Sequence, residues 1–530
     1  MLIEILTGVL VSGFTSGSAI SPADVASAFR RTCGPVDAAH QEQACRVHPG
    51  VPEDSPAQGT VDKKPKAEKK PEAEKQPKAE KKPKAEKKPK KKKVPKNDQL
   101  SPDEPVDPDA AVEPAGRGLR FSWKQHPSVR FGSVARVDFE AKLQEDGRQS
   151  YPNAKGLEDP STLKPQPFQF HRNRIGVQGN FFKHIEYEAE YELTEQELTE
   201  KDVLLGLTPK SQWKDVNVNV TYVKNAQIRV GKFKIPFGLD QLTGVSHNDF
   251  VFRSLGASYL APARDIGGMV HGRFFKRGLN YWTGVFVHDG DNARSKKIEG
   301  GDQTFAARVT GTPFRKSSVE GLQAIEVGTA FTLSKLTDDS FRPNGLRGRT
   351  VLTQDTFNSP VYVKGQRRRW EADADWLSGP FSARAEFTWQ TDDRLQQGIG
   401  DDDLPDARAQ SWYVSGSWIV TGEDKKRPVR PADDFLRGGI GAVELVGRYE
   451  RMWFDSVGQS LPADQARNPR AENILPSGDY ALTLGVNWTL NRFMKLQVNA
   501  IREHVEDPQR NPVPLGAAFW SRVLRLQFVL

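Results

Sequence analysis

The sequence has no run of eighteen consecutive apolar residues, although it is 530 residues long. A helix that crosses a membrane needs about 20 such residues. We therefore expect no membrane helix beyond a candidate secretory signal in residues 1–20. That segment has an apolar centre followed by small residues, but Glu4 stands where such signals usually carry Lys or Arg.

Cysteine is scarce, with only Cys33 and Cys45 in the chain. In an oxidising compartment these two could close one small disulfide loop, and otherwise they are two thiols. The His and Cys residues show no spacing typical of metal ligands, so no metal site or cofactor is expected. The sequence also lacks a G-x-S-x-G elbow and a P-loop, which leaves no enzyme class to favour. We expect no nucleic-acid partner.

Composition divides the chain into four parts: residues 1–20, a short Cys-containing region over 21–60, a low-complexity linker over 61–118, and residues 119–530. The linker repeats Lys, Pro, Ala and Glu and has almost no side chain that could form a core. It should therefore be a disordered tail with extended polyproline II character. Such a tail is either a solvated spacer in the periplasm or an electrostatic attachment to peptidoglycan or lipid headgroups.

Residues 119–530 alternate apolar and polar side chains in segments of ten to eighteen residues. In Ile185–Leu193, for example, Ile, Tyr, Ala, Tyr and Leu alternate with four Glu residues. This period of two indicates β-strands that have one apolar face. Over Val129–Leu143 the same pattern predicts one strand, with Arg130 and Arg136 on its polar face.

The pattern predicts sixteen strands, and an even number is the rule for bacterial outer-membrane barrels. They should start near residues 127, 168, 183, 214, 226, 265, 278, 302, 319, 360, 379, 408, 438, 477, 493 and 516. Some connections are very short, whereas residues 144–167, 235–264 and 337–359 give long ones. We therefore expect an all-β fold, a sixteen-stranded antiparallel transmembrane β-barrel. A soluble jelly roll or propeller is the alternative.

The inward faces of such a barrel would be rich in arginine. Residues 119–530 hold 35 Arg and 20 Lys, whereas the linker repeat uses Lys alone. Arg keeps its charge and presents a planar fork to oxyanions, and rings of cations select anions in pores. Alternation points the following residues inward: Arg130, Arg136, Arg172, Arg174, Arg229, Arg367, Arg369, Arg384 and Arg448. The alternative is that they brace the wall by pairing with inward Glu and Asp.

Residues 229–272 carry the most informative motif. A strand ends at Pro236-Phe237-Gly238, about twenty-five residues without strand pattern follow, and a strand begins at Asp265. A loop of that length in a barrel is usually functional. It carries Arg253, Arg264 and the neutral Ser246 and Asn248.

The segments GKFKIPFGLDQLT, RSL and LAPARDIGGMVHG resemble the signature of the phosphate-selective porin O and P family. The resemblance implies a trimeric barrel in the outer membrane of a Gram-negative bacterium, with an inward constriction loop and a cationic path for phosphate or polyphosphate. It assigns the anion path to Arg229, Lys232, Lys234, Arg253 and Arg264, and, by strand position only, to Arg130, Arg136, Arg172 and Arg174. Asp240, Ser246 and Asn248 would be polar groups of the constriction loop.

The leading hypothesis is therefore a passive anion porin that also contacts outer-membrane lipid and lipopolysaccharide. A general or sugar porin would need an aromatic lining, and a barrel enzyme would need a catalytic set at one rim. A wall tether would act through the Lys-rich tail. Asp401–Asp403 is expected to be a solvated loop tip, with a weak Ca²⁺ site as the alternative.

Overall fold

The computed structural model describes residues 118–123, 126–151, 168–194, 212–276, 278–290, 303–336, 346–353, 355–358, 361–398, 400–456, 474, 476–507 and 518–530. Residues 1–117 lie outside the described residues. The candidate signal, the Cys33 and Cys45 pair and nearly all of the low-complexity linker lie there, so these predictions remain predictions.

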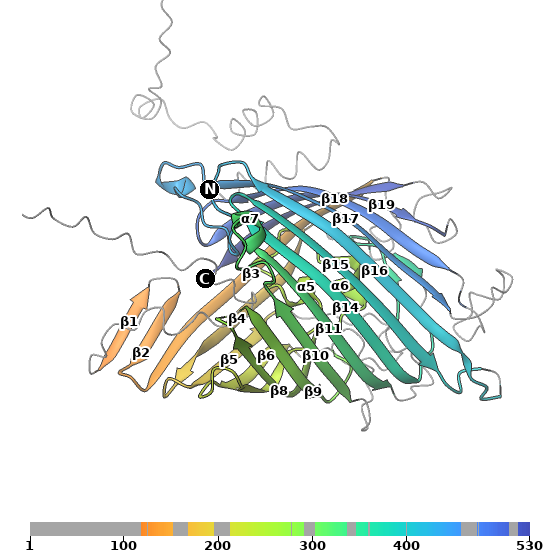
Figure 1. The fold of residues 1–530 in the computed structure, drawn as a ribbon. Helices are drawn as coiled ribbons and strands as arrows, with labels where there is room; N and C mark the ends of the chain where they lie inside the picture. Colours follow the sequence, from red (N-terminus) through yellow and green to blue (C-terminus); the bar gives the residue numbers. More distant parts are fainter. Residues whose placement is uncertain are drawn as a thin grey trace, which may run out of the picture. The chain divides into compact units, whose positions relative to one another are not determined.

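The described residues form a sixteen-stranded antiparallel barrel, as the alternation predicts (Figure 1). The barrel closes where β20 pairs with β3, with Leu526 opposite Glu145. The strands are β3 (Ala135–Tyr151), β4 (Phe168–Phe181), β5 (Ile185–Glu192), β6 (Trp213–Val220), β7 (Gln227–Lys234), β8 (Arg264–Phe274), β9 (Leu279–Phe286), β10 (Thr304–Gly311), β11 (Ile325–Leu336), β14 (Gly365–Ser378), β15 (Phe381–Arg394), β16 (Leu404–Ile419), β17 (Ala442–Ser456), β18 (Ser477–Thr489), β19 (Met494–Val505) and β20 (Phe519–Val529).

The prediction of a single strand over Val129–Leu143 is wrong. A turn at residues 132–134 separates β2 (Pro127–Phe131) from β3, and β1 (Leu119–Trp123) pairs with β2 to form a hairpin beside the barrel. The alternation hides this turn because the hairpin keeps Arg130 opposite Arg136 on the same face. The predicted connection over 144–167 is also too long, since β3 continues through its first eight residues.

The two ends of the barrel have different connections. At the short-turn end most neighbouring strands are joined by a few residues, although residues 312–324 and 420–441 make longer connections. These two contain α7 (Glu320–Gln323) and the 3-10 turn η2 (Phe435–Arg437). At the long-loop end the connections are longer, and one of them, residues 346–363, contains the small hairpin of β12 (Gly348–Arg349) and β13 (Thr356–Asn358).

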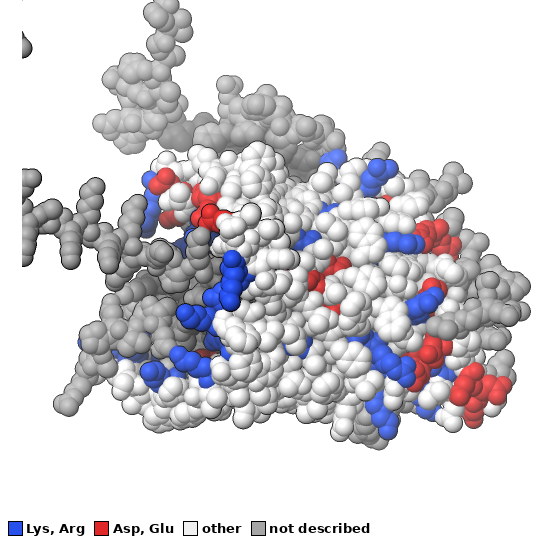
Figure 2. All heavy atoms as spheres, viewed as in Figure 1, with Lys and Arg blue, Asp and Glu red and all other residues white. Residues whose placement is uncertain are grey.

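Side chains alternate between the lumen and the outer wall, except at bulges such as the one between β3 and β4. Along β17, Glu444, Arg448 and Glu450 are buried inward, whereas Leu445 and Tyr449 are exposed outward. Figure 2 shows a mostly uncharged band around the middle of the drawn face, with charged residues gathered toward its ends. Such a face suits lipid contact. Among the described residues, no helix is long and apolar enough to span a membrane.

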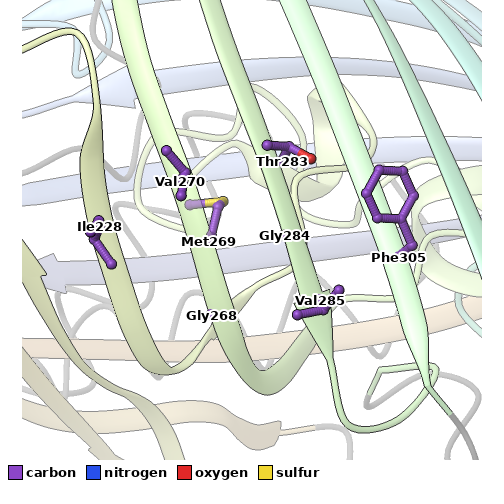
Figure 3. Close-up of a pocket in the computed structure, with 8 residues that line it drawn as sticks. All are labelled: Ile228, Gly268, Met269, Val270, Thr283, Gly284, Val285 and Phe305. Atoms are coloured by element: carbon purple, nitrogen blue, oxygen red, sulfur yellow. The ribbon is translucent and has the colours of Figure 1, made fainter.

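A shallow groove on the outer wall has no part in the lumen (Figure 3). It is lined by exposed apolar side chains that include Ile228, Val270, Val285 and Phe305. Gly268 leaves it open, because a Cβ there would meet only a Val side-chain carbon, 3.8 Å away. The groove therefore faces lipid, and the candidate site has to be sought inside the barrel.

Candidate functional site: the lumen and its inward loop

The inward loop consists of residues 235–263, between β7 and β8, and contains α5 (Leu239–Leu242) and α6 (Leu255–Tyr259). Its first residues, Ile235 and Phe237, are fully buried in an apolar cluster with Phe233, Met269 and Phe286 on the adjoining wall. This cluster turns the chain into the lumen where it leaves the strand. The predicted inward loop is therefore present, and Figure 1 shows both of its helices among the strands.

Backbone N–H groups of the loop are held by acceptors from distant strands. The N–H of Asp240 donates to Glu386 of β15 at 2.9 Å, and that of Leu255 donates to Glu450 of β17 at 2.6 Å. The N–H of Val251 donates to the side-chain oxygen of Asn499 of β19 at 2.8 Å. The loop therefore crosses the lumen, and three of its buried donors are satisfied by the facing wall.

Cations of the same wall hold the loop carbonyls. Arg525 donates to the carbonyl of Val251 at 2.7 Å, and Arg448 donates to that of Phe252 at 3.1 Å. Lys495 donates to the carbonyl of Asn248 at 3.0 Å. Although these side chains are cationic and point inward, they have a structural role. Each donates a hydrogen bond to a backbone carbonyl that would otherwise be buried without a partner.

Residues 346–363 fill another part of the lumen at the long-loop end. Leu346, Leu352 and Phe357 pack with Leu255 and Leu260 of the inward loop in a second apolar cluster. Inward residues of β16 to β20 complete this cluster, among them Met452, Phe454, Ile501 and Val523. At the long-loop end, the β16–β20 side of the lumen is thus filled with apolar side chains.

The exposed fraction of the inward cations also differs between the two sides of the lumen. The side chains of Arg367 and Arg369 on β14 are 1% exposed, whereas those of Arg136 and Lys142 on β3 are 23% and 21% exposed. Water therefore reaches these two cations of β3 more readily. We place the accessible part of the lumen along this wall.

Arginines on β10, β14 and β15 brace the wall. Arg308 donates to Glu371 at 2.8 Å and Asp373 at 2.6 Å, while Asp289 accepts from both Arg367 and Arg369. Buried ion pairs of this kind are costly to break from one side. The sequence predicts that four arginines of these walls and of β17 point inward: Arg367, Arg369, Arg384 and Arg448. In the structure all four pair with acidic residues, which is the alternative interpretation given above, that they brace the wall.

Most of the cations predicted to form the anion path have partners in the structure. Arg136 pairs with Asp138, Arg174 with Glu190 and Glu192, Arg264 with Asp215, and Lys234 donates to the carbonyl of Leu242. Arg229 lies over Phe233, Arg130 lies on the hairpin outside the closed ring, and Lys232 is buried.

The predicted polar residues of the loop mainly contact other loop residues and the wall that holds the loop. Asp240 accepts the N–H of Ser254 at 2.6 Å and lies 3.9 Å from Arg253. Ser246 and Asn248 offer their backbone carbonyls to Lys495. The side-chain oxygen of Asn248 is buried and has no hydrogen-bond partner among the described residues.

Four arginines meet at the loop and form what we call the cationic cluster: Arg148, Arg172, Arg253 and Arg525. Arg148 and Arg525 lie over the ring of Phe252 in the loop, and Arg172 is close enough to Arg253 and Arg525 for mutual repulsion. Arg525 and Arg148 share Asp146, and Asp240 faces Arg253. Positive charge therefore exceeds negative charge here.

Within the cationic cluster, the charge of Arg172 is the least compensated by carboxylates. It donates to the side-chain oxygen of Gln144 at 2.7 Å, and no described carboxylate lies within ion-pair distance of it. A half-buried guanidinium beside other cations is a strong site for an anion with several oxygens. Arg172 was predicted from strand position, whereas Arg148 and Arg525 were missed because they lie far from the motif.

Sequence reasoning also missed a latch at the short-turn end, formed by Lys425 with Asp249 and Glu444. Lys425 comes from the 420–441 connection, is fully buried, and reaches Asp249 of the inward loop at 2.5 Å and also Glu444. Burial alone would raise the pKa of Asp249, but Lys425 and Arg427 outweigh it and hold that pKa below its usual range. The latch thus ties the loop to the short-turn end.

Comparisons with known proteins identify relatives of this chain. A family model described as phosphate-selective porin O and P matches residues 153–530. Porin O of Pseudomonas aeruginosa is 23% identical over 390 residues, which cover 68% of this chain and 81% of that protein.

Solved structures also show similarity. An anion-selective porin from Comamonas acidovorans is 11% identical, with a TM-score of 0.44 over 75% of this chain and all of that one. The outer-membrane channel DcaP of Acinetobacter baumannii is 9% identical, with a TM-score of 0.46 over 75% of this chain and 98% of that one.

Proposed function

This chain belongs to the phosphate-selective porin O and P family, and we propose that it passes phosphate-like anions along the β3–β7 wall and through the cationic cluster. It is an outer-membrane porin, a passive channel for anions. The preference for phosphate or polyphosphate is the part we propose, and no reaction chemistry is assigned to the chain.

The observation that carries the proposal is the surplus of guanidinium groups at the loop. Arg253 lies on the inward loop and Arg172 lies near it on β4, and both keep partial exposure. An entering phosphate would exchange hydration water for guanidinium N–H donors, two from each planar fork. Because these arginines also have carbonyl or amide partners, binding stays reversible, as conduction requires.

Single-channel recording of the purified full chain tests the proposal. We expect anion selectivity and block of chloride current by phosphate. Replacing Arg172 by Gln should weaken phosphate block roughly 10- to 100-fold, since one hydrogen bond to a charged group contributes about 1.5–3 kcal/mol. Arg437→Gln is the control, because Arg437 is 82% exposed outside the lumen and its loss changes the net charge equally.

Two results would contradict the proposal. One is cation selectivity of the unmodified channel. The other is equal phosphate block in Arg172→Gln and in the control. A channel that instead shows saturable block by sugars, unaffected by Arg172→Gln, would indicate the general porin that sequence analysis left as the alternative.

The proposal includes further expectations. Three copies should assemble, which native electrophoresis of detergent extracts measures. The Lys-rich linker should lie in the periplasm, where its positive charge would favour peptidoglycan at low salt. Deleting residues 61–117 should leave conduction unchanged and lower salt-sensitive binding to isolated peptidoglycan.

A further inference from the structure

Two arginines stand on the outer wall near the long-loop end. Arg502 of β19 and Arg522 of β20 are exposed, whereas their neighbours Glu503 and Ser521 are buried inward. By register Arg502 lies opposite Trp520, and Arg522 is two residues further along β20 on the same face. Diagonal neighbours of this kind have Cα atoms about 7–8 Å apart, so both guanidinium groups can reach one ligand.

Neither arginine has a hydrogen bond or ion pair with any residue that the structure describes, whereas three other outward arginines at that end have one. At the same end Arg368 pairs with Asp393 at 3.0 Å, Arg408 with Asp455 at 2.6 Å, and Arg451 with Glu506 at 2.7 Å. Each of those charges is neutralised on the wall itself. Arg502 and Arg522 have no such carboxylate.

Their surroundings belong to the edge of the lipid-facing band. Toward the short-turn end, the same face of β19 and β20 continues with aliphatic Val498, Leu524 and Leu526. Beside the arginines stands Trp520, which is 40% exposed. Aromatic residues mark the membrane interface of barrels, so the two charges lie where acyl chains give way to headgroups.

We propose that Arg502 and Arg522 bind the phosphorylated headgroup of a glycolipid in the outer leaflet, with its acyl chains along Val498, Leu524 and Leu526. The proposal rests on the proposed function in one respect, that the long-loop end faces outward. Guanidinium forks suit phosphate oxygens. Two charges placed in a half-dry interface without protein partners gain most from an anion that brings its own apolar chains.

Binding of lipid A to the full chain in detergent tests this, with bound lipid counted by native mass spectrometry. We expect bisphosphorylated lipid A to be retained at least roughly 10-fold more than dephosphorylated lipid A, because two charge-assisted contacts are lost with the phosphates. The double variant Arg502→Gln/Arg522→Gln should lose this preference. The double variant Arg437→Gln/Arg492→Gln, which removes two exposed arginines at the short-turn end, should keep it.

Any of four outcomes would overturn the proposal. The two double variants could retain lipid A equally, or the unmodified chain could retain both lipids equally. Millimolar inorganic phosphate could displace lipid A, or Arg502→Gln/Arg522→Gln could dissociate an oligomer without releasing lipid. Heat-modified migration on gels checks that each variant is folded. Anion selectivity measured on the same samples keeps the two proposals separate, because Arg502→Gln/Arg522→Gln should leave phosphate block unchanged.

Discussion

The latch gives the sharpest test of how the inward loop is held. Lys425→Met removes the ammonium group and keeps most of the side-chain volume. It leaves Asp249 and Glu444 buried without their common cation. We expect the loop to detach from the short-turn end more often, while the barrel strands stay paired.

The magnitude follows from the contacts that remain. Removing one partner of a buried ion pair costs about 3–5 kcal/mol. Here Glu444 keeps a hydrogen bond from Asn487 at 3.1 Å, and Asp249 keeps Arg427 at 3.8 Å. We therefore take the lower value of about 3 kcal/mol, which corresponds to a roughly 150-fold rise in the population of the detached loop.

Open-channel current noise measures that population. Lys425→Met should show frequent partial closures and altered conductance. Lys426→Met should behave like the unmodified channel, because Lys426 is the adjacent and exposed lysine. The double variant Lys425→Met/Asp249→Asn should recover part of the quiet state, since it removes one stranded charge. Equal noise in Lys425→Met and Lys426→Met would refute the latch.

Three further predictions concern the frame of the site. Asp289→Asn should lower barrel stability by about 3 kcal/mol in urea titration and leave anion selectivity unchanged, because it weakens a buried brace of β14, away from the β3 wall; altered selectivity would contradict the placement of the anion path along β3–β7. Gly231→Ala should impair folding in the heat-modified gel assay, because φ there is +125° and a Cβ would stand 2.3 Å from a facing backbone oxygen, whereas Gly447→Ala, whose nearest neighbour is a side-chain carbon at 3.6 Å, should fold normally. The difference in channel noise between Lys425→Met and the unmodified channel should be the same at pH 8 and pH 5, because the lowered pKa of Asp249 keeps this carboxylate ionised above its ordinary value of 3.8 and its contribution is lost only as the pH falls below that; a difference that shrinks by pH 5 would count against the latch.

The fold could be predicted from sequence because every barrel strand has one face in lipid. That constraint imposes alternation, and alternation locates strands such as Ile185–Glu192 and Ser477–Thr489 closely. Alternation does not reveal where the chain reverses direction. A turn that keeps the same faces, as at residues 132–134, leaves no trace in the pattern.

The site could be predicted only in part. Motif residues such as Arg253 and Arg264 lie near the loop because the chain itself brings them there. Arg525 reaches the loop from the last strand, and Lys425 reaches it from a connection at the other end. Such contacts depend on how the closed barrel folds its loops inward, and no local spacing records that.

Arg172 and Arg174 show why inward direction alone does not define an anion path. They lie two residues apart on the same face of β4, yet Arg174 meets Glu190 and Glu192 while Arg172 meets none. The reason is register: Arg174 pairs with Glu192, the last residue of β5, so Arg172 lies beyond the end of the glutamate ladder. Along β4, an arginine is neutralised where β5 continues beside it and is left for a ligand where β5 stops. The length of β5 therefore sets where the cationic cluster begins.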